Sequence, residues 1–547
     1  MKNKFLLFTI AITLIASLNI TFGQGPVAPN LGTAANFVLF SSDGAVTMNT
    51  GNFSILTGDI GTGNPATTST GFGNVNGTHH DGDATGIAAA GHLLLAYNQI
   101  WAMTPDDTIA PLLGGGDTLI EGVYFIGAST TLDLTLYLDG KGDPGSVFIF
   151  RIDAPFSTNA NSKIKLINGA QACNVFWAAN GLIDMATGTS MKGTVIANND
   201  AIIMAVGDTL EGRALSTTGA ITVNGVFAYT PLGCGTPVLT GPTAPVLGAT
   251  ACFALFSSTG AVSNTGVTKV TGDVGSNGTT APTGFVAGDV TGTIHLSADA
   301  STAQCANDLA TVYTYLSTLP IDILLRFPAQ FGNNLVLTPH SYHLNAATTL
   351  TDTVVLNAQG NANGVFFIKI NGALQTSVNS KVKLINGAQS KNVYWLVEGA
   401  VVLDDNSVFE GTLVVNNAAL GALNTGLNFH GRALTTTGAL TTTAISIVAA
   451  GIPSSGCNNG TVAVSSLDAA NGGISIFPNP SNGEFVISGL ESTGQLQIFN
   501  SLGQMVLETV VNSNQQTINL NSASGIYFYK VTGNNNTVQS GKLISQQ

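Results

Sequence analysis

Histidines and acids that could catalyse a reaction or hold a metal are scarce and scattered in this sequence. Lys, Arg, Asp and Glu together make up 9% of the 547 residues, and there are 7 histidines. The densest group is His79, His80, Asp81 and Asp83, and imidazole and carboxylate groups are common metal ligands. Because adjacent histidines in a Gly/Asp loop before a helix are more typical of a turn and a helix N-cap, we favour that interpretation.

Two further acidic patterns are even weaker candidates for a metal site or a catalytic site. Asp139 and Asp143 lie in DGKGDPG, which resembles a calcium loop but lacks its terminal glutamate, so a turn is favoured. Glu211 and Glu410 each precede a glycine at a coil corner and have no obvious catalytic partner. We therefore expect no catalytic residue, no metal site, no cofactor and no enzymatic activity.

The pattern that does recur is built from threonine. Motifs that begin with Thr and end three residues later with Thr, Asn or Ser are regular in the second half of the chain and poorer in the first. The preference of Thr for strands explains any single motif, whereas repetition at one place in a larger repeat favours a function. The candidate residues are Thr265, Thr268, Thr376, Asn379, Thr425, Asn428, Thr443, Ser446, Thr158, Asn161, Thr187, Ser190 and Thr209.

The elements that must position these threonines occur twice. SKIKLINGAQACNVFW (Ser162–Trp177) recurs as SKVKLINGAQSKNVYW (Ser380–Trp395), and GRALSTTGAI (Gly212–Ile221) recurs as GRALTTTGAL (Gly431–Leu440). These and shorter blocks keep their order along the chain. A duplicated domain explains this self-similarity, so the two halves are expected to share one fold.

A shorter period inside each copy predicts a coiled β-solenoid. Segments of short apolar runs broken by Gly or Asn follow one another at 19 or 20 residues. A coil of that length accommodates three short strands and three corners, which gives a triangular cross-section. The segment starts are Asn174, Gly193 and Gly212 in copy one and Asn392, Gly411 and Gly431 in copy two.

One stretch in each copy departs from the β pattern. Ala84–Trp101 and Ala298–Leu316 are rich in Ala and Leu, and their apolar residues recur at helical spacing. Each is predicted to form one long helix packed along its solenoid, where it would cover an apolar face.

The two ends of the chain are different in character. Lys2 and Lys4 precede the apolar run Phe5–Ile20, which predicts a signal peptide cut before Gln24; the run is too short to favour a membrane anchor. Near the other end, alternating apolar and polar residues with turns predict a small β-sandwich. The predicted segments are signal peptide 1–23, copy one 24–235, linker 236–246, copy two 247–450, linker 451–473 and a C-terminal module 474–547.

The C-terminal module resembles the type A sorting domain of the bacterial type IX secretion system. FPNP, NG.F, LG, GIY and GK.I fall in the order of that family. The resemblance implies a bacterium of the Bacteroidota, recognition by the type IX secretion machinery, export past the outer membrane and removal of the module on the way.

Five cysteines in an exported chain predict disulfides with one cysteine left over. Cys252 and Cys305 have no counterpart in copy one, so we expect them to pair with each other. Cys173 and Cys234 would then pair within copy one, and Cys457 would remain.

Both copies resemble the widespread microbial ice-binding (antifreeze) domain. The blocks that carry the resemblance include TGDIG, VNGT, LINGAQACNVFW and GRAL in copy one and TGDVG, VTGTIH, LINGAQSKNVYW and GRAL in copy two. It implies a mainly β fold of two tandem discontinuous right-handed solenoids, each with a helix alongside. It also implies an ice-binding face bearing Thr-Ala/Gly-x-Thr/Asn, which copy two fits at Thr265 and Thr425 and nearly fits at Thr376 and Thr443.

A stiff array of threonines suits ice for a physical reason. Stacked strands lie about 4.7–4.9 Å apart and alternate residues of a strand about 7 Å apart, close to oxygen repeats on ice planes. Copy one departs more from the motif, and Phe53 and Phe227 would spoil its flatness if they point outward. We therefore expect a secreted protein that adsorbs to the surface of ice crystals and inhibits their growth, with copy two the stronger binder.

Other partners are disfavoured by composition. The chain has a formal net charge of -13 and no basic stripe, which argues against nucleic acid. A cell-surface adhesin that attaches the bacterium to ice or another surface is the alternative. A carbohydrate-binding solenoid would need a groove with aromatics and paired acids, and the sequence shows neither clearly. We expect a monomer with no small-molecule substrate.

Overall fold

The structure, a computed structural model, falls into two compact units, 1–457 and 458–547, which are described separately. The predicted signal peptide and nearly all of the second linker lie outside the described residues. Those residues are 25–49, 52–234, 237–452, 475–489, 493–512, 515–521, 523–533 and 538–546.

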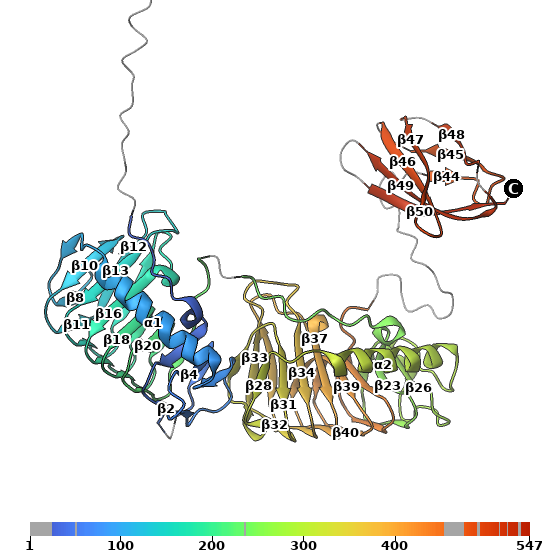
Figure 1. The fold of residues 1–547 in the computed structure, drawn as a ribbon. Coiled ribbons are helices and arrows are strands. Elements are labelled where there is room, and N and C mark those ends of the chain that lie inside the picture. Colours follow the sequence, from blue (N-terminus) through green and yellow to red (C-terminus); the bar gives the residue numbers. More distant parts are fainter. Residues whose placement is uncertain are drawn as a thin grey trace, which may run out of the picture. The chain divides into compact units, whose positions relative to one another are not determined.

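Parallel strands on three faces build each coil of the first solenoid, which we name domain 1 (Figure 1). One coil runs through β16 (Val175–Asn180), β17 (Ile183–Met185) and the first half of β18 (Ser190–Asn198). Ile183 pairs with Ile202 in the next coil, which gives the predicted step of 19 residues.

We name the three sides the helix face, the flat face and the third face. A 14-stranded sheet supplies the helix face and the third face, because β18 and β20 continue around the corner between them. Its helix-face strands are β6 (His79–Asp81), β4 (Asp59–Thr62), β1 (Phe37–Ser41), β20 (Thr209–Ser216), β18, β16, β13 (Phe148–Ile152), β10 (Gly122–Ile126) and β7 (Asp107–Thr108). Its third-face strands are β3 (Ile55–Thr57), β22 (Phe227–Tyr229), β15 (Lys163–Ile167), β12 (Thr135–Asp139) and β9 (Thr118–Ile120).

The flat face is a separate 8-stranded sheet. Its strands are β5 (Ser69–Thr70), β2 (Val46–Met48), β21 (Ile221–Val223), β19 (Ile202–Met204), β17, β14 (Phe156–Thr158), β11 (Thr130–Asp133) and β8 (Leu112–Gly114). The solenoid is discontinuous, as predicted, because β1 pairs with β20 and so places the N-terminal segment beyond the last coil of the copy.

A long helix covers the helix face. α1 (Ala84–Ala102) begins one residue after Asp83, whose carboxylate accepts a hydrogen bond from the Gly86 amide at 2.8 Å. Its apolar side packs on buried residues such as Phe176 and Ile196, and Figure 1 shows it lying across these strands. Inside the triangle a second core contains Trp177, whose ring stacks on Phe150 at 3.8 Å between centroids.

The second solenoid, domain 2, repeats this plan. α2 (Ala300–Thr318) begins with a capping box between Asp299 and Thr302 and packs on its own helix face. The flat-face strands are β24 (Val262–Thr265), β42 (Leu440–Thr443), β40 (Leu420–Leu423), β38 (Val401–Leu403), β35 (Leu374–Thr376), β32 (Thr348–Thr351) and β29 (Phe331–Gly332).

The other two faces of domain 2 again share a 14-stranded sheet. Its strands are β23 (Phe253–Ser257), β25 (Lys269–Thr271), β26 (Asp273–Ser276), β27 (Val290–Thr291), β28 (Ile323–Leu325), β30 (Leu335–Leu337), β31 (Ser341–Leu344), β33 (Thr353–Asn357), β34 (Phe366–Ile370), β36 (Lys381–Ile385), β37 (Val393–Val397), β39 (Val408–Val415), β41 (Asn428–Thr435) and β43 (Ser446–Val448).

The C-terminal unit is an antiparallel sandwich. Apolar side chains of both sheets, among them Ile487 and Leu496, form its core. One sheet has β44 (Ser475–Phe477), β45 (Glu484–Ser488) and β48 (Gln516–Asn519); the other has β47 (Met505–Val511), β46 (Gly494–Asn500), β49 (Gly525–Gly533) and β50 (Val538–Ser545).

The cysteines correct one prediction. Cys173 and Cys234 form a disulfide, as expected. The expected pair Cys252–Cys305 is wrong, because Cys305 is a free thiol on the buried side of α2 whereas Cys252 is disulfide-bonded. Cys457 lies outside the described residues. Duplication shows which cysteines are extra in copy two but not which of them lie close together.

Candidate functional site

The flat face of domain 2 is the side of that solenoid on which small, uncharged side chains are most regularly placed. Strand residues alternate between the interior and the surface. In β42, Leu440 and Thr442 are fully buried, whereas Thr441 between them reaches the surface. Helix α2 packs on a different face, so it leaves these outward residues open.

The outward residues of this sheet form rows that run across the strands. In the central row, Ser263 pairs with Thr441, and their hydroxyl oxygens lie 3.4 Å apart. The rest of the row consists of Thr349, Gln375, Val402 and Ala422, paired in that order. No member of this central row carries a charge.

A second row, at the entrance of each strand, is made of alanines. The amide nitrogens of successive strands bond to their carbonyls, for example Leu374 N to Ala400 O and Val401 N to Ala419 O. A methyl group standing on a rigid backbone presents little volume and no charge, so this row keeps the face flat. Its members are Ala373, Ala400, Ala419, Ala439 and Ala261.

The sequence motifs lie at the next corner, where the chain leaves this sheet. Thr425, Thr443 and Thr265 each precede a residue with positive φ, namely Gly426 (75°), Ala444 (47°) and Gly266 (76°). Backbone hydrogen bonds from Gly426 N to Ala444 O and from Ala444 N to Thr265 O stack these corners. The positive φ explains why the second motif position favours glycine. We call these three threonines the corner row.

The structure scatters the predicted residues over four environments, of which three are at the surface. Thr425, Thr443, Thr265 and Thr187 stand at corners next to a flat face. Asn428, Ser446, Ser190 and Thr209 begin third-face strands, beyond the corner. Asn379 (φ 62°) and Asn161 (φ 61°) are the positive-φ corner residues themselves.

Three predicted residues are buried and cannot contact a surface ligand. Thr268, Thr376 and Thr158 are 2%, 0% and 6% exposed. Their hydroxyls serve the corners instead: Thr376 Oγ1 accepts from Asp404 N at 2.7 Å, and Thr158 Oγ1 accepts from Ala186 N at 2.9 Å. The spacing of two polar residues in sequence does not say which of them points inward, and in these coils the threonine occupies an inward strand position.

The third face has a different character, because lysines and other titratable residues line it. Lys381 and Lys383 project from β36, Lys269 from β25, and His430 bonds to Glu410 at 2.9 Å. Charged groups order water around themselves, so this face is a poor template for any regular water lattice. The contrast singles out the flat face rather than the third face.

The flat face of domain 1 shares the plan but is interrupted. Thr222 and Thr47 pair across strands with hydroxyls 3.4 Å apart, as in domain 2. The same row then contains Ile203 and Asp184 and ends at Leu112, which is 65% exposed.

The two phenylalanines that were expected to spoil this flatness lie outside the flat face. Phe53 and Phe227 are 56% and 37% exposed, but Phe227 begins the third-face strand β22 and Phe53 precedes the third-face strand β3. The interruptions of the row are therefore Ile203, Asp184 and Leu112, because a bulky side chain or a carboxylate in the row lifts neighbouring groups away from any flat surface that is brought against it.

The histidine and acid cluster closes the helix N-terminus in both copies. His80 Nδ1 lies 2.7 Å from Asp83, the N-cap of α1, and His295 Nδ1 lies 2.7 Å from Asp299, the N-cap of α2. His79 bonds to Ser69, and burial lowers its pKa to about 4. These contacts account for the residues as capping elements, and no group of three metal-ligating side chains occurs among the described residues.

A short sequence motif marks the strands that carry these rows. The tripeptide Ala-Leu/Val-x recurs in several coils, as in Ala373-Leu374-Gln375 and Ala439-Leu440-Thr441. The apolar middle residue points inward and its two neighbours point outward. A period of two therefore identifies Thr441 and Ser263 as outward residues, whereas Thr349 follows Ala347-Thr348, which lacks the apolar middle residue.

Comparisons with known proteins agree with this architecture. The Ice-binding-like family matches residues 40–226 and 256–448, and the Secretion system C-terminal sorting domain matches residues 475–546. The crystal structure of an ice-binding protein from an Antarctic bacterium of the Flavobacteriaceae is 55% identical, covers 77% of this chain and 99% of that chain, and has a TM-score of 0.75.

Curated relatives match about a third of this chain, and the chain spans less than two thirds of the length of the two described next. The ice-binding protein of Nostoc sp. (strain HG1) is 35% identical over 167 residues, which is 30% of this chain and 60% of that protein. Ice-binding protein 1 of Shewanella frigidimarina is 35% identical over 214 residues, 33% of this chain and 24% of that protein. Since the family model covers both solenoids, and with them most of the chain, this protein belongs to the ice-binding-like family.

Proposed function

We propose that this chain is a secreted ice-binding protein that adsorbs to ice through the flat face of domain 2. The observation that carries the proposal is the lattice made by the alanine row, the central row and the corner row. These three rows are uncharged, and the first charged corner is Asp405, next to Thr425 and ahead of the positive-φ residue Asn406. The face comprises Thr441, Ser263 and Thr349, with the corner threonines Thr425, Thr443 and Thr265 on one side of them and the alanine row on the other.

The physical basis is the match between a rigid lattice and ordered water. Methyl groups favour cages of water around them, and hydroxyl groups hydrogen-bond those waters in place. Each contact is weak, but a face fixed by backbone hydrogen bonds loses little entropy when all contacts form together. Hydroxyls 3.4 Å apart, as in Ser263 and Thr441, are spaced for sharing such waters rather than for bonding strongly to each other.

The protein then acts by adsorption rather than by catalysis, and a single copy of the chain suffices. Inhibition of ice growth and recrystallisation follows from adsorption, because ice must grow around each bound molecule. The C-terminal sorting domain indicates that the chain is secreted or attached to the cell surface. Attachment would make it an adhesin that holds the cell to ice through the same face.

Ice-affinity partitioning of the mature chain, with thermal hysteresis measured on the same sample, tests the proposal. Thr425→Tyr at the corner should lower both, because a ring there lifts the face off the ice, while the fold is kept. Thr311→Tyr on α2 is the matched control, since Thr311 is an exposed threonine on the helix. A mature chain that stays in the melt as ice grows, or a Thr425→Tyr variant as active as the control, contradicts the proposal.

A further inference from the structure

Two asparagines at the end of domain 1 are buried although asparagine usually faces solvent. Asn74 is 8% exposed and Asn76 is 3% exposed. The backbone of Asn76 bridges to Thr57 of β3, so this segment belongs to the last coil of domain 1. Their side chains, by contrast, bond to domain 2.

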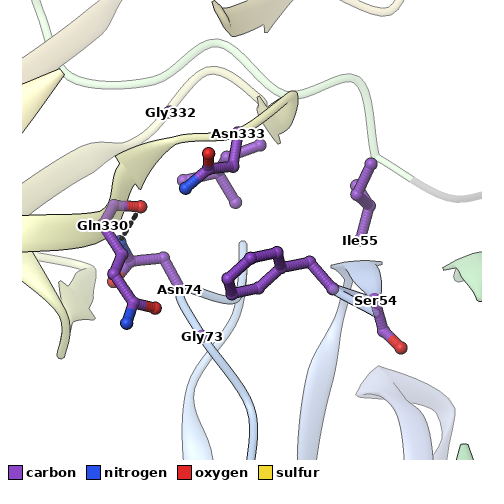
Figure 2. A pocket seen from close by; sticks show the side chains of 9 residues that line it. Ser54, Ile55, Gly73, Asn74, Gln330, Gly332 and Asn333 are labelled. Carbon is purple, nitrogen blue, oxygen red and sulfur yellow. Dashed lines mark hydrogen bonds between the residues drawn. The ribbon is translucent and has the colours of Figure 1, made fainter. Parts of the chain in front are cut away.

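Asn74 pairs with the backbone of domain 2 through both atoms of its amide. Its Nδ2 donates to Phe327 O at 2.8 Å, and its Oδ1 accepts from Phe327 N at 2.9 Å. A longer contact of 3.4 Å joins Nδ2 to Gln330 O. Figure 2 shows Asn74 beside Gln330 and Asn333 of domain 2, with Ser54 and Ile55 of domain 1 on the opposite side.

Asn76 completes a polar network that is closed to solvent. Its Nδ2 donates to Thr338 Oγ1 at 3.0 Å, and the hydroxyl of Tyr342 lies 2.7 Å from its Oδ1. That hydroxyl also accepts from Thr338 N at 3.0 Å. Thr338 and Tyr342 are 2% and 0% exposed, so each polar atom depends on its partner across the junction.

The duplication shows that these groups occur only at the two ends that meet. At the other end of domain 2, Asp289 and Thr291 stand in place of Asn74 and Asn76. At the other end of domain 1, Tyr124 is the counterpart of Tyr342. Its hydroxyl also donates to the carbonyl four residues earlier, but that carbonyl belongs to Ile120, which is 48% exposed, and not to a threonine such as Thr338. The outer ends therefore lack the matching donors and acceptors, which opposes open-ended stacking of further copies.

The covalent connection between the domains is also short and fastened on both sides. Its start is tied to domain 1 by the disulfide Cys173–Cys234. Leu239 O then accepts from Asn361 Nδ2, and Thr240 O accepts from Val365 N, which holds the chain to domain 2. The five steps from Cys234 to Leu239 span at most about 18 Å, so the connection alone permits little separation.

We propose that Asn74 and Asn76 fasten the two solenoids head to tail into one rigid body. This inference rests on the proposed function: domain 1 and domain 2 then bind ice as a single unit. The weaker face of domain 1 adds its contacts without further loss of entropy from orienting one domain relative to the other. Asn74 and Asn76 are positioning residues in this account, since neither lies on a flat face.

Hydrogen exchange of the full chain, followed by mass spectrometry of peptides covering 72–78 and 327–342, tests the rigid body without ice. Asn76→Val should speed exchange on both sides of the junction by at least tenfold. Thr338→Val, which removes the acceptor from the other side, should do the same. Thr291→Val is the control, because Thr291 is the exposed counterpart of Asn76, and exchange at the junction should stay unchanged.

Hydrogen exchange tests the rigid junction, and thermal hysteresis tests its role on ice. Faster exchange on both sides in both junction variants supports the rigid body, whereas unchanged exchange, or a change confined to the side mutated, overturns it. Thermal hysteresis of the same samples then tests the single unit on ice: a fall with Asn76→Val but not with Thr291→Val supports it. Hysteresis equal to wild type despite an opened junction overturns it, while a wild-type chain that does not bind ice is a failure of the proposed function alone.

Discussion

The flat faces of domains 1 and 2 stand on the same scaffold and differ almost only in the side chains that point outward. Thr222 and Thr441 occupy the same place in the two copies, and each pairs with a hydroxyl residue on the N-terminal strand. Further along the row, domain 1 has Ile203 and Asp184, whereas domain 2 has Ala422 and Val402.

The comparison shows that the fold constrains the inward residues of each strand, whereas the outward residues are constrained only by the function of the face. Inward residues such as Ile183 and Val401 remain apolar in both copies, because the triangular core must be filled. Outward residues are free of that constraint and have diverged. One duplicated solenoid can therefore keep its stability while its surface gains or loses a flat, uncharged lattice.

Repair of domain 1 should have the largest effect on activity. In a chain whose domain 2 face is blocked by Thr441→Tyr, the double change Asp184→Thr and Ile203→Thr should raise thermal hysteresis several-fold, because it completes a row of threonine and serine hydroxyls. Lys165→Thr on the third face is the control and should give no recovery. Equal recovery in the control would show that surface threonine content, not its place, matters.

Loss of the Cys173–Cys234 disulfide should have the largest effect on stability, and this effect should be confined to domain 1. The double change Cys173→Ser and Cys234→Ser opens a link across 61 residues, and such a loss costs about 2–4 kcal/mol. Domain 2 has Lys391 where domain 1 has Cys173, so it has no equivalent bond there. Chemical denaturation, read by hydrogen exchange of peptides from each domain, should show the loss in domain 1; equal losses in both domains would contradict this.

The pH dependence of stability should also differ between the domains, by a smaller amount. Burial raises the pKa of Asp208 in domain 1 to about 7, from an ordinary value of 3.8, while domain 2 has Leu427 at that place. The folded state therefore favours the protonated acid. Its contribution to stability is complete below pH 3.8 and is lost as the pH rises through 7.

The slope in that window is at most about 1.4 kcal/mol per pH unit. Calorimetry at pH 5 and pH 8 should show domain 1 less stable at pH 8, and Asp208→Asn, which removes the titrating group, should flatten the dependence. Thr189 N and Ala205 N bond to different oxygens of Asp208, and asparagine keeps an acceptor for only one of them, so the slope with pH and not the absolute stability of the variant is the readout. A wild-type chain as stable at pH 8 as at pH 5, or a variant with an unchanged slope, would refute the assignment.

The smallest effect is expected at Cys305. This free thiol is fully buried on the inner side of α2, and copy one has the buried Ala89 at the same place of α1, so the fold accommodates alanine there. Cys305→Ala should lower the free energy of unfolding by less than about 1.5 kcal/mol. Cys305→Asn, which buries an amide in the apolar helix face, should cost clearly more, and equal costs would show that packing at this site is loose.

Much of the fold could be predicted because its periods are strong. The repeated blocks gave two copies, the 19-residue step gave the coils, and Asp83 and Asp299 mark the helix starts. The predicted helices Ala84–Trp101 and Ala298–Leu316 differ from α1 and α2 by no more than two residues at each end. Helix ends are fixed by local capping, which a single sequence contains.

The site was harder to predict because it depends on register. Thr425 and Thr265 stand at exposed corners, but Thr376 and Thr158 point inward, and a shift of one residue in a strand exchanges its two sides. The predicted pairing of Cys252 was wrong for a related reason, because the spacing of cysteines in the sequence does not determine how far apart they lie in the fold. The apolar residue in each Ala-Leu/Val-x tripeptide points inward, so it indicates which residues of that strand point outward.

The paired variants Thr441→Tyr and Thr222→Tyr test the central claim most directly. They place the same ring at the same position of the two copies, so any difference reports the faces rather than the scaffold. Thermal hysteresis of the full mature chain should fall to a small fraction with Thr441→Tyr and only slightly with Thr222→Tyr. Equal losses, or a larger loss with Thr222→Tyr, would contradict the assignment of ice binding to the flat face of domain 2.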